Sequence, residues 1–294
     1  MNYQWYPGHM TKAKRMMEEN IKLIDLVIEI VDARIPISSR NPDIDSLAVN
    51  KARIILLNKS DLADDKITNQ WINYFNENNI YCLKLNSRNN SGIKQVNGLI
   101  MTACADKIER NKQRGILNRP IRAMVVGIPN VGKSTFINSY AGKASAKTGN
   151  KPGVTKGKQW IKLNKNVERL DTPGNEWPKH DNQEVGKRLA MIGSMNDEIL
   201  NVEELAIDTI KYIYSEYSDN VIERYGLDKE KTAASYDENA INPDNSVALY
   251  IMEQAAVKRG CIKKGNNIDY EKISNIILDD FRSGRLGRIS LETP

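Results

Sequence analysis

The sequence predicts an α/β fold, a parallel sheet with crossover helices, followed by a smaller all-helical C-terminal domain. Up to about residue 170, short apolar runs rich in Val, Ile and Leu alternate with amphipathic stretches. Such alternation is typical of buried parallel strands joined by helices. Beyond about residue 180 the strand-like runs stop and helical spacing takes over. We therefore expect one domain over 1–178 and a second over 179–294.

The individual elements follow from the same pattern. The expected strands are nearly continuous apolar runs at 26–31, 53–57, 80–85, 123–127, 159–163 and 167–170. Amphipathic stretches near 64–79, 93–114 and 133–141 would form the helices between them. In the second domain, helical spacing recurs at 183–193, 199–225, 245–259 and 270–282, with Gly and Asn-Pro residues at the breaks.

Composition excludes several classes of protein. The chain has 294 residues, of which 40% are hydrophobic and 27% charged, as in ordinary two-domain globular proteins. No apolar run approaches the roughly 18 residues of a membrane span, and the N-terminus lacks the apolar core of a secretory signal. Cys82, Cys104 and Cys261 are too few and too far apart for a disulfide framework or a zinc cluster. We expect a cytoplasmic protein with no membrane span and no evident stable protein partner.

The positive charge is segregated along the chain. Net charge is +6, and residues 143–165 contain seven lysines and no acid. Basic residues also dominate 107–122 and 258–288. Segregated basic stretches favour a polyanionic partner such as RNA, although each could also be a solvated face. The candidate RNA-binding residues are Lys156, Lys158, Lys258, Arg259, Lys263, Lys264, Arg282, Arg285 and Arg288.

The clearest motif is GIPNVGKS at residues 127–134, which follows a strand-like run and begins a helical stretch. This is the phosphate-binding loop G-x-x-x-x-G-K-[ST], whose backbone N–H groups and helix N-terminus surround phosphate oxygens. Lys133 would reach the β- and γ-phosphates and Ser134 would hold Mg²⁺. The expected nucleotide contacts in this loop are Asn130, Val131, Gly132, Lys133, Ser134 and Thr135.

Two polar motifs after neighbouring strands could read a guanine base. In NKSD, Asn58–Asp61, the carboxylate of Asp61 can accept both the ring N–H and the exocyclic amine, and the stem of Lys59 can lie along the base. Ser60 completes this loop. Asn86 and Ser87 follow the next strand, where a backbone N–H would meet the base carbonyl. Alone, NKSD could equally be a polar turn after a strand.

A third group of residues fits a γ-phosphate sensor. In DTPG, at 171–174, Asp171 suits a magnesium ion through a bound water and Gly174 suits a backbone N–H to the γ-phosphate. Thr155 lies in the Gly-containing segment KPGVTKG and fits a switch hydroxyl that binds Mg²⁺ only with the γ-phosphate present. The alternative for Thr155 is an ordinary loop threonine.

The order of these motifs is unusual, because the guanine motifs precede the phosphate motifs. The sequence therefore resembles the circularly permuted P-loop GTPases. The segments QWYPGHM, VDARIPISSRNP and DTPGNEWPK bring the resemblance closer to the bacterial factors that assemble the large ribosomal subunit. The similarity covers nearly the whole chain and is densest over residues 1–180.

The resemblance implies a circularly permuted GTP-binding domain and a helical RNA- or ribosome-binding domain. It implies an enzyme that hydrolyses GTP to GDP and phosphate, binds immature large subunits, and promotes a late assembly step with ribosome-stimulated turnover. The alternative is a nucleotide-gated RNA-binding module whose hydrolysis is incidental. A small-molecule P-loop kinase is disfavoured, since it would have no use for NKSD.

The resemblance also assigns parts of the hydrolytic apparatus. Lys133 would be catalytic together with His9, for which the alternative is an N-terminal anchor beside Trp5. Asn130 resembles the Asn that coordinates K⁺ in potassium-activated GTPases, so K⁺ would be an activating ion beside Mg²⁺. After Gly174, where many GTPases have Gln, this chain has Asn175, which departs from the resembled pattern as well.

Overall fold

The computed structural model describes residues 10–142, 160–170 and 182–294. They form two units, which are described separately. One unit contains the sheet and also includes Glu292–Pro294, and the other is Asn182–Leu291. The boundary expected at 178/179 lies outside the described residues. The last three residues differ from our expectation, because they belong with the sheet and not with the helices.

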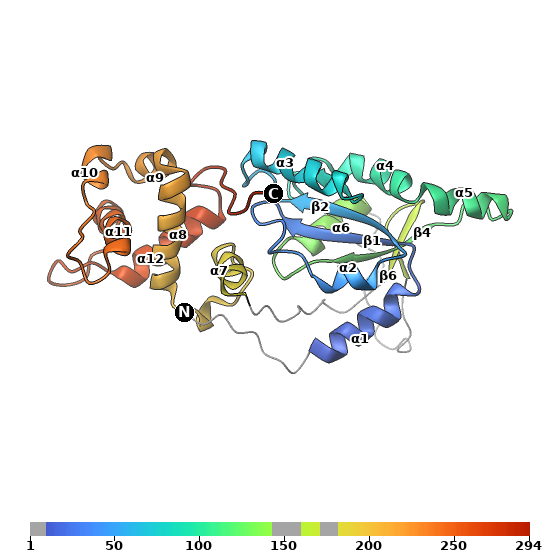
Figure 1. Cartoon of the computed structure of the whole chain (residues 1–294), viewed down its shortest axis with the longest axis horizontal. Helices are drawn as coiled ribbons and strands as arrows, with labels where there is room; N and C mark the ends of the chain where they lie inside the picture. The colour runs from blue at the N-terminus through green and yellow to red at the C-terminus, as the bar shows by residue number, and fades with distance from the viewer. Residues whose placement is uncertain (1–9, 143–159, 171–181) are drawn as a thin grey trace. The chain divides into compact units, whose positions relative to one another are not determined.

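The first unit is built on a six-stranded sheet in the order β3-β2-β1-β4-β6-β5 (Figure 1). The strands pair in parallel, except for β5, which is antiparallel to β6. This confirms the predicted α/β class. The strands are β1 Leu26–Asp32, β2 Ala52–Asn58, β3 Tyr81–Lys84, β4 Ile121–Val126, β5 Trp160–Lys162 and β6 Val167–Leu170.

Six helices of the sheet unit lie in the described residues. They are α1 Met10–Ile21, α2 Asp43–Leu47, α3 Asp65–Glu77, α4 Ile93–Ala103, α5 Ala105–Gln113 and α6 Lys133–Ala141. The sequence pattern did not anticipate α1 or α2. The stretch expected as one helix over 93–114 is two helices, because the backbone of Cys104 leaves the helical region and ends α4.

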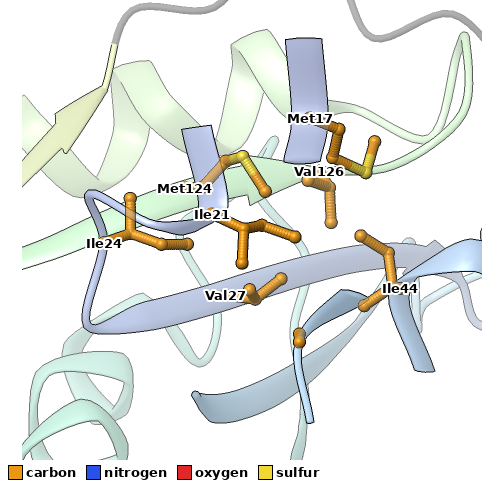
Figure 2. Packing of buried hydrophobic residues seen from close by; sticks show 8 residues of the cluster. Met17, Ile21, Ile24, Val27, Ile44, Met124 and Val126 are labelled. Carbon is orange, nitrogen blue, oxygen red and sulfur yellow. The ribbon is translucent and has the colours of Figure 1, made fainter. Parts of the chain in front are cut away.

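One face of the sheet carries two apolar clusters. Successive strand residues point to opposite faces, so Val27 and Val31 of β1 share a face. Val27 packs with Met17 and Ile21 of α1 and with Ile44 of α2 (Figure 2). Val31 belongs to the second cluster, which includes Trp71, Phe75, Ile55, Leu57 and Cys82. Burial of these side chains packs α1, α2 and α3 against the strands. The polar motifs follow the carboxyl ends of these strands.

The second unit is helical, and no strand is found within 182–291. Its helices are α7 Gln183–Met191, α8 Val202–Glu216, α9 Ser218–Tyr225, α10 Lys229–Ala233, α11 Ser246–Arg259 and α12 Tyr270–Arg282, with short 3₁₀ turns at Asp197–Ile199 and Pro243–Asn245. α8 is central and packs against α7, α9, α11 and α12. The stretch expected at 199–225 divides at Tyr217, whose backbone is not helical.

Buried and half-buried ionic groups join the helices of this unit. Asp280 on α12 is buried and accepts hydrogen bonds from Arg224 (2.8 and 2.9 Å) and from Arg285 Nε (2.5 Å). Arg282, also on α12, donates to the carbonyls of Met191 and Ala190 and pairs with Asp197. These contacts connect α12 to α9, α7 and the first 3₁₀ turn. No described helix of either unit is long and apolar enough to cross a membrane.

The end of the sequence contacts the loop after β1. The buried Glu292 carboxylate accepts hydrogen bonds from the backbone N–H groups of Ile37 (2.8 Å) and Ser38 (3.1 Å) and from the Ser38 hydroxyl. The Trp71 indole N–H donates to the Glu292 carbonyl at 3.1 Å. These bonds explain why Glu292–Pro294 belongs to the sheet unit.

Candidate active site

The phosphate loop joins β4 to α6 at the carboxyl edge of the parallel sheet. Gly127 and Gly132 both have positive φ, 154° and 95°. A Cβ at Gly127 would collide with the Ile30 carbonyl oxygen, and one at Gly132 would collide with the Asn58 amide. The two glycines are therefore required by close approach of the backbone to β1 and β2. Asn130, with φ of 63°, adds a further left-handed position that Asn tolerates well.

α6 begins directly after this loop, at Lys133, with its N-terminus open toward the loop. The first N–H groups of a helix lack partners within the helix, and with the helix dipole they attract anions. Ser134 and Thr135, in the first turn, are exposed. Among the described residues neither hydroxyl makes a hydrogen bond, so the Ser134 oxygen can serve as a ligand for Mg²⁺.

Lys133 supplies the positive charge of the loop. Its Nζ donates to the carbonyl oxygen of Ile128 at 2.7 Å, so the side chain folds back over the loop. Burial lowers the pKa of Lys133 to about 8 because desolvation penalises the ammonium form. An anionic phosphate at this point would offset that penalty, which is the arrangement expected of a phosphate-binding lysine.

Asn58, at the end of β2, connects the phosphate loop to the second guanine motif. Its Nδ2 donates to the Val131 carbonyl at 2.7 Å. Its Oδ1 accepts from both the backbone N–H and the hydroxyl of Ser87 at 3.0 Å. The Ser139 hydroxyl of α6 in turn donates to the Ser87 carbonyl at 2.6 Å. One buried amide thus fixes two loops that the sequence separates widely, and this places the predicted motifs around one edge.

The rest of the guanine motif follows Asn58. Lys59 has φ of 56°, and its Nζ lies 3.1 Å from the Asp32 carboxylate. The backbone N–H of Ser60 donates to the Leu85 carbonyl at 3.1 Å. Asp61 is exposed, and within the described part of the chain its carboxylate has no hydrogen-bond or ionic partner. It is therefore available as the acceptor pair for a base.

Asn86 and Ser87 form the loop after β3. Asn86 is buried, and its Oδ1 accepts the backbone N–H of Arg88 at 2.8 Å. Its own backbone N–H donates to Ser91 at 3.0 Å. These bonds close a tight turn beside Asn58. The Asn86 side chain therefore shapes the loop, which leaves the backbone as the group that can meet a base.

Several predicted site residues lie outside the described residues: His9, Thr155, Lys156, Lys158, Asp171, Gly174 and Asn175. The structure brings together Asn58–Asp61, Asn86, Ser87 and Asn130–Thr135. Sequence reasoning missed Asp32 and Arg34 beside Lys59. The segment VDARIPISSRNP had been noted only for its resemblance, and no spacing rule indicated that its acid would reach the lysine of NKSD.

The predicted RNA-binding residues of the helical unit differ in how many hydrogen-bond or ionic partners they have within the unit. Lys264 is exposed and has no hydrogen-bond or ionic partner among the described residues, and Lys263 lies 3.4 Å from Asp269. Lys258 donates to the Gly226 carbonyl. Three of the arginines lie beside acids. The Arg259 guanidinium lies 4.0 Å from the Asp280 carboxylate, Arg282 pairs with Asp197, and Arg285 pairs with Asp279 and Asp280. Arg288 is exposed.

Comparison with known proteins gives a consistent answer. A family model described as "50S ribosome-binding GTPase" matches residues 122–236. The chain is 45% identical to "Ribosome biogenesis GTPase A" of Bacillus cereus over 294 residues, which covers 100% of this chain and 95% of that protein. The family model spans the phosphate loop, and the full-length relative spans the guanine motifs as well.

Two solved structures are similar over almost the whole chain. The GDP-bound structure of TM YlqF has a TM-score of 0.65 and 25% identity, and covers 95% of this chain and 99% of that chain. The GNP-bound YlqF from T. maritima has a TM-score of 0.60 and 26% identity, with coverage of 96% and 98%. With the full-length relative in B. cereus, they confirm the predicted GTPase activity and the permuted order of motifs. The chain belongs to the ribosome biogenesis GTPase A family of circularly permuted GTPases.

Proposed function

We propose that this chain binds immature large ribosomal subunits and promotes a late step of their assembly, with GTP hydrolysis stimulated by the ribosome. The observation that carries the proposal is the edge organised by Asn58, which joins guanine and phosphate loops, in a chain similar along its full length to ribosome biogenesis factors. The place of action would be the bacterial cytoplasm. The partners would be GTP, GDP, ribosomal RNA and ribosomal proteins.

The chemistry proposed for this edge is electrostatic. Lys133 and the N–H groups at the start of α6 would neutralise charge on the β- and γ-phosphates, where negative charge shifts during cleavage. Ser134 would hold Mg²⁺, with Thr155 as a second ligand and Asp171 acting through a bound water. Bound there, Mg²⁺ would supply Lewis-acid stabilisation of the charge on the phosphates. The Gly174 N–H would report the presence of the γ-phosphate.

Two further groups belong to the proposal. His9 would orient or polarise the attacking water once the particle is bound. Asn130, which is exposed and has a left-handed backbone, would contribute an oxygen ligand to K⁺ beside the phosphates. Such an ion supplies the positive charge that an arginine finger brings in other GTPases.

RNA contact is proposed for Lys156, Lys158, Lys258, Arg259, Lys263, Lys264, Arg285 and Arg288. We leave out Arg282, because its guanidinium already makes four hydrogen bonds between α12 and the α7 region. Lys263 and Lys264 are the sharpest candidates, since both are exposed and Lys264 has no hydrogen-bond or ionic partner in the described part of the chain.

The central experiment measures GTP turnover with purified large subunits, mature and immature, in K⁺ and in Na⁺. We expect stimulation by immature particles and faster turnover in K⁺. If particles bind but leave turnover unchanged, the chain is instead a nucleotide-gated RNA-binding module. If turnover is equal in K⁺ and Na⁺, the assignment of Asn130 to an activating ion is wrong.

A second experiment addresses His9. His9→Ala should leave GTP affinity nearly intact and reduce particle-stimulated turnover by roughly ten- to a thousand-fold, the range of a lost proton-transfer or positioning group. Unchanged stimulated turnover would make His9 an N-terminal anchor.

A third experiment addresses RNA contact. Replacing Lys263 and Lys264 with Ala should weaken particle binding and reduce the slope of log affinity against log salt by about one to two units. The matched control is Lys229→Ala, an exposed lysine of α10 outside these clusters, paired with Asp219. An equal effect of the control would show that general charge, and not this surface, is responsible.

A further inference from the structure

We propose that Asp32 is a positioning residue for guanine recognition, which holds the Lys59 side chain in place beside the base. The inference rests on the proposed guanine role of Asn58–Asp61. It is carried by the position of β1 beside β2, because these two parallel strands end next to each other. Asp32 is the last residue of β1 and is in register with Asn58, the last residue of β2. Lys59 is the next residue, and its ammonium lies 3.1 Å from Asp32 Oδ2.

The backbone of Lys59 is held in a conformation that directs its side chain. Its φ of 56° lies in the left-handed region, which lysine seldom adopts. Three backbone bonds fix the turn: Ala33 N–H to Asn58 O at 2.9 Å, Ser60 N–H to Leu85 O at 3.1 Å, and Leu62 N–H to Lys59 O at 2.9 Å. The turn sets the direction of the lysine side chain, and the ion pair with Asp32 sets the position of its ammonium group.

Asp32 is itself rigidly fixed. Its Oδ1 accepts from the Arg34 backbone N–H at 3.1 Å and Nε at 2.9 Å, and its Oδ2 accepts from Nη2 at 2.8 Å. Its backbone N–H donates to the Ser39 hydroxyl at 3.0 Å, and that hydroxyl donates to the Ile35 carbonyl at 2.6 Å. The carboxylate thus has no freedom to follow Lys59, so the lysine must come to it.

The carboxylate also keeps its charge. Burial alone would raise the pKa of Asp32, but the charges of Arg34 and Lys59 and the hydrogen bonds from Arg34 outweigh burial and hold the pKa well below its usual range. Arg34 is 1% exposed and the Lys59 side chain 26%. Arg34 therefore neutralises Asp32 inside the protein, while Lys59 spans from this buried pair to the edge where the base would lie.

The consequence for binding is preorganisation. A free lysine side chain has many rotamers, and ordering it when the base arrives reduces affinity. The Asp32 contact orders it beforehand, with the apolar stem available to the base and the charge directed away from it. We expect loss of the contact to weaken GDP binding by about 3- to 10-fold.

The test is a double-mutant cycle on GDP affinity, measured by calorimetry well below the melting temperature. Asp32→Asn should weaken binding by that factor in the wild-type background and have no further effect in a Lys59→Ala background. The matched control is Glu29→Gln, a buried carboxylate on the same strand that pairs with Arg40 and lies 3.7 Å from Arg53. It should lower the melting temperature without changing GDP affinity.

Lys59→Met tests the proposal without disturbing the buried pair. It keeps an apolar stem and removes the ammonium, so it should weaken binding about as much as Asp32→Asn. Wild-type affinity in Lys59→Met, or equal losses from Asp32→Asn in both backgrounds, would overturn the proposal. The guanine assignment fails separately, if the wild-type protein binds ADP as tightly as GDP.

Discussion

Cations are used differently in the two units. In the helical unit, Arg282, which the sequence suggested for RNA, is engaged by Asp197 and by two backbone carbonyls. At the edge of the sheet, the one hydrogen bond found for Lys133 in the described chain goes to a carbonyl, and burial lowers its pKa to about 8. A half-buried cation with no acid beside it gains more from an anionic ligand than a paired arginine does. Counting basic residues therefore overstates how many are available to a polyanion.

The largest effect should come from removing Lys133, which has no acidic partner among the described residues. Lys133→Ala should reduce GTP hydrolysis by at least about 10²–10³-fold, since the γ-phosphate loses a fixed positive partner. The melting temperature should hardly change, because Lys133 makes no ion pair within 10–142, 160–170 and 182–294. Lys112→Ala, an exposed lysine of α5 outside the motifs, should leave turnover unchanged. Normal turnover in Lys133→Ala would show that this loop is not the reaction site.

Asp61→Asn removes an acceptor that has no partner of its own in the described structure. GTP affinity should fall roughly ten- to a hundred-fold, about 1–3 kcal/mol, because the base amine and ring N–H lose their carboxylate. Competition between labelled GDP and unlabelled GTP or ATP measures the effect. A variant that keeps wild-type preference for GTP over ATP would contradict the assignment.

Asp280→Asn is the counterpart in the helical unit. It should destabilise that unit by about 1.5–3 kcal/mol, the scale of a lost charged hydrogen bond, because Arg224 and Arg285 lose their anion. These arginines lower the pKa of Asp280 against the effect of burial, so its contribution is present above the unfolded pKa and is lost on acidification. Thermal melting followed by circular dichroism measures the change. A large fall in GTP affinity at a temperature where the variant is folded would contradict the purely structural role of this ion pair.

The smallest expected effect is the pH dependence of nucleotide binding. With a pKa near 8, Lys133 is charged at pH 7 and mostly neutral at pH 9. A phosphate favours the charged form, so binding takes up a proton and GDP affinity should fall about tenfold between these pH values. In Lys133→Arg the cation does not titrate, and the dependence should flatten. A flat profile for the wild type would mean that Lys133 is protonated throughout.

The sequence carried enough information for the sheet and for the nucleotide motifs, because both are local patterns. β1 and β2 are nearly continuous apolar runs, and GIPNVGKS specifies a loop by its glycines. The helix break at Cys104 was not foreseen, since both halves of that stretch are amphipathic. The order of the guanine and phosphate motifs was readable and identified the permutation.

Contacts made across the sheet could not be read in this way. Asp32 contacts Lys59 only because two parallel strands end in register. No sequence motif between the two residues predicts this contact. Arg282 looked like a surface cation by composition, but its partners are 85 to 92 residues away in the chain. Charge patterns describe what a segment carries, whereas the fold decides which charges are already matched.

The contact of Glu292 with Ser38 and Trp71 has a consequence for how the chain folds during its own synthesis. Chains fold broadly in the order in which they are synthesised. The strands of the sheet are complete before α7 is made, yet the N–H groups of Ile37 and Ser38 receive their acceptor only from residues that follow the whole helical unit. The first unit to begin folding therefore acquires these hydrogen bonds only after translation has passed α12.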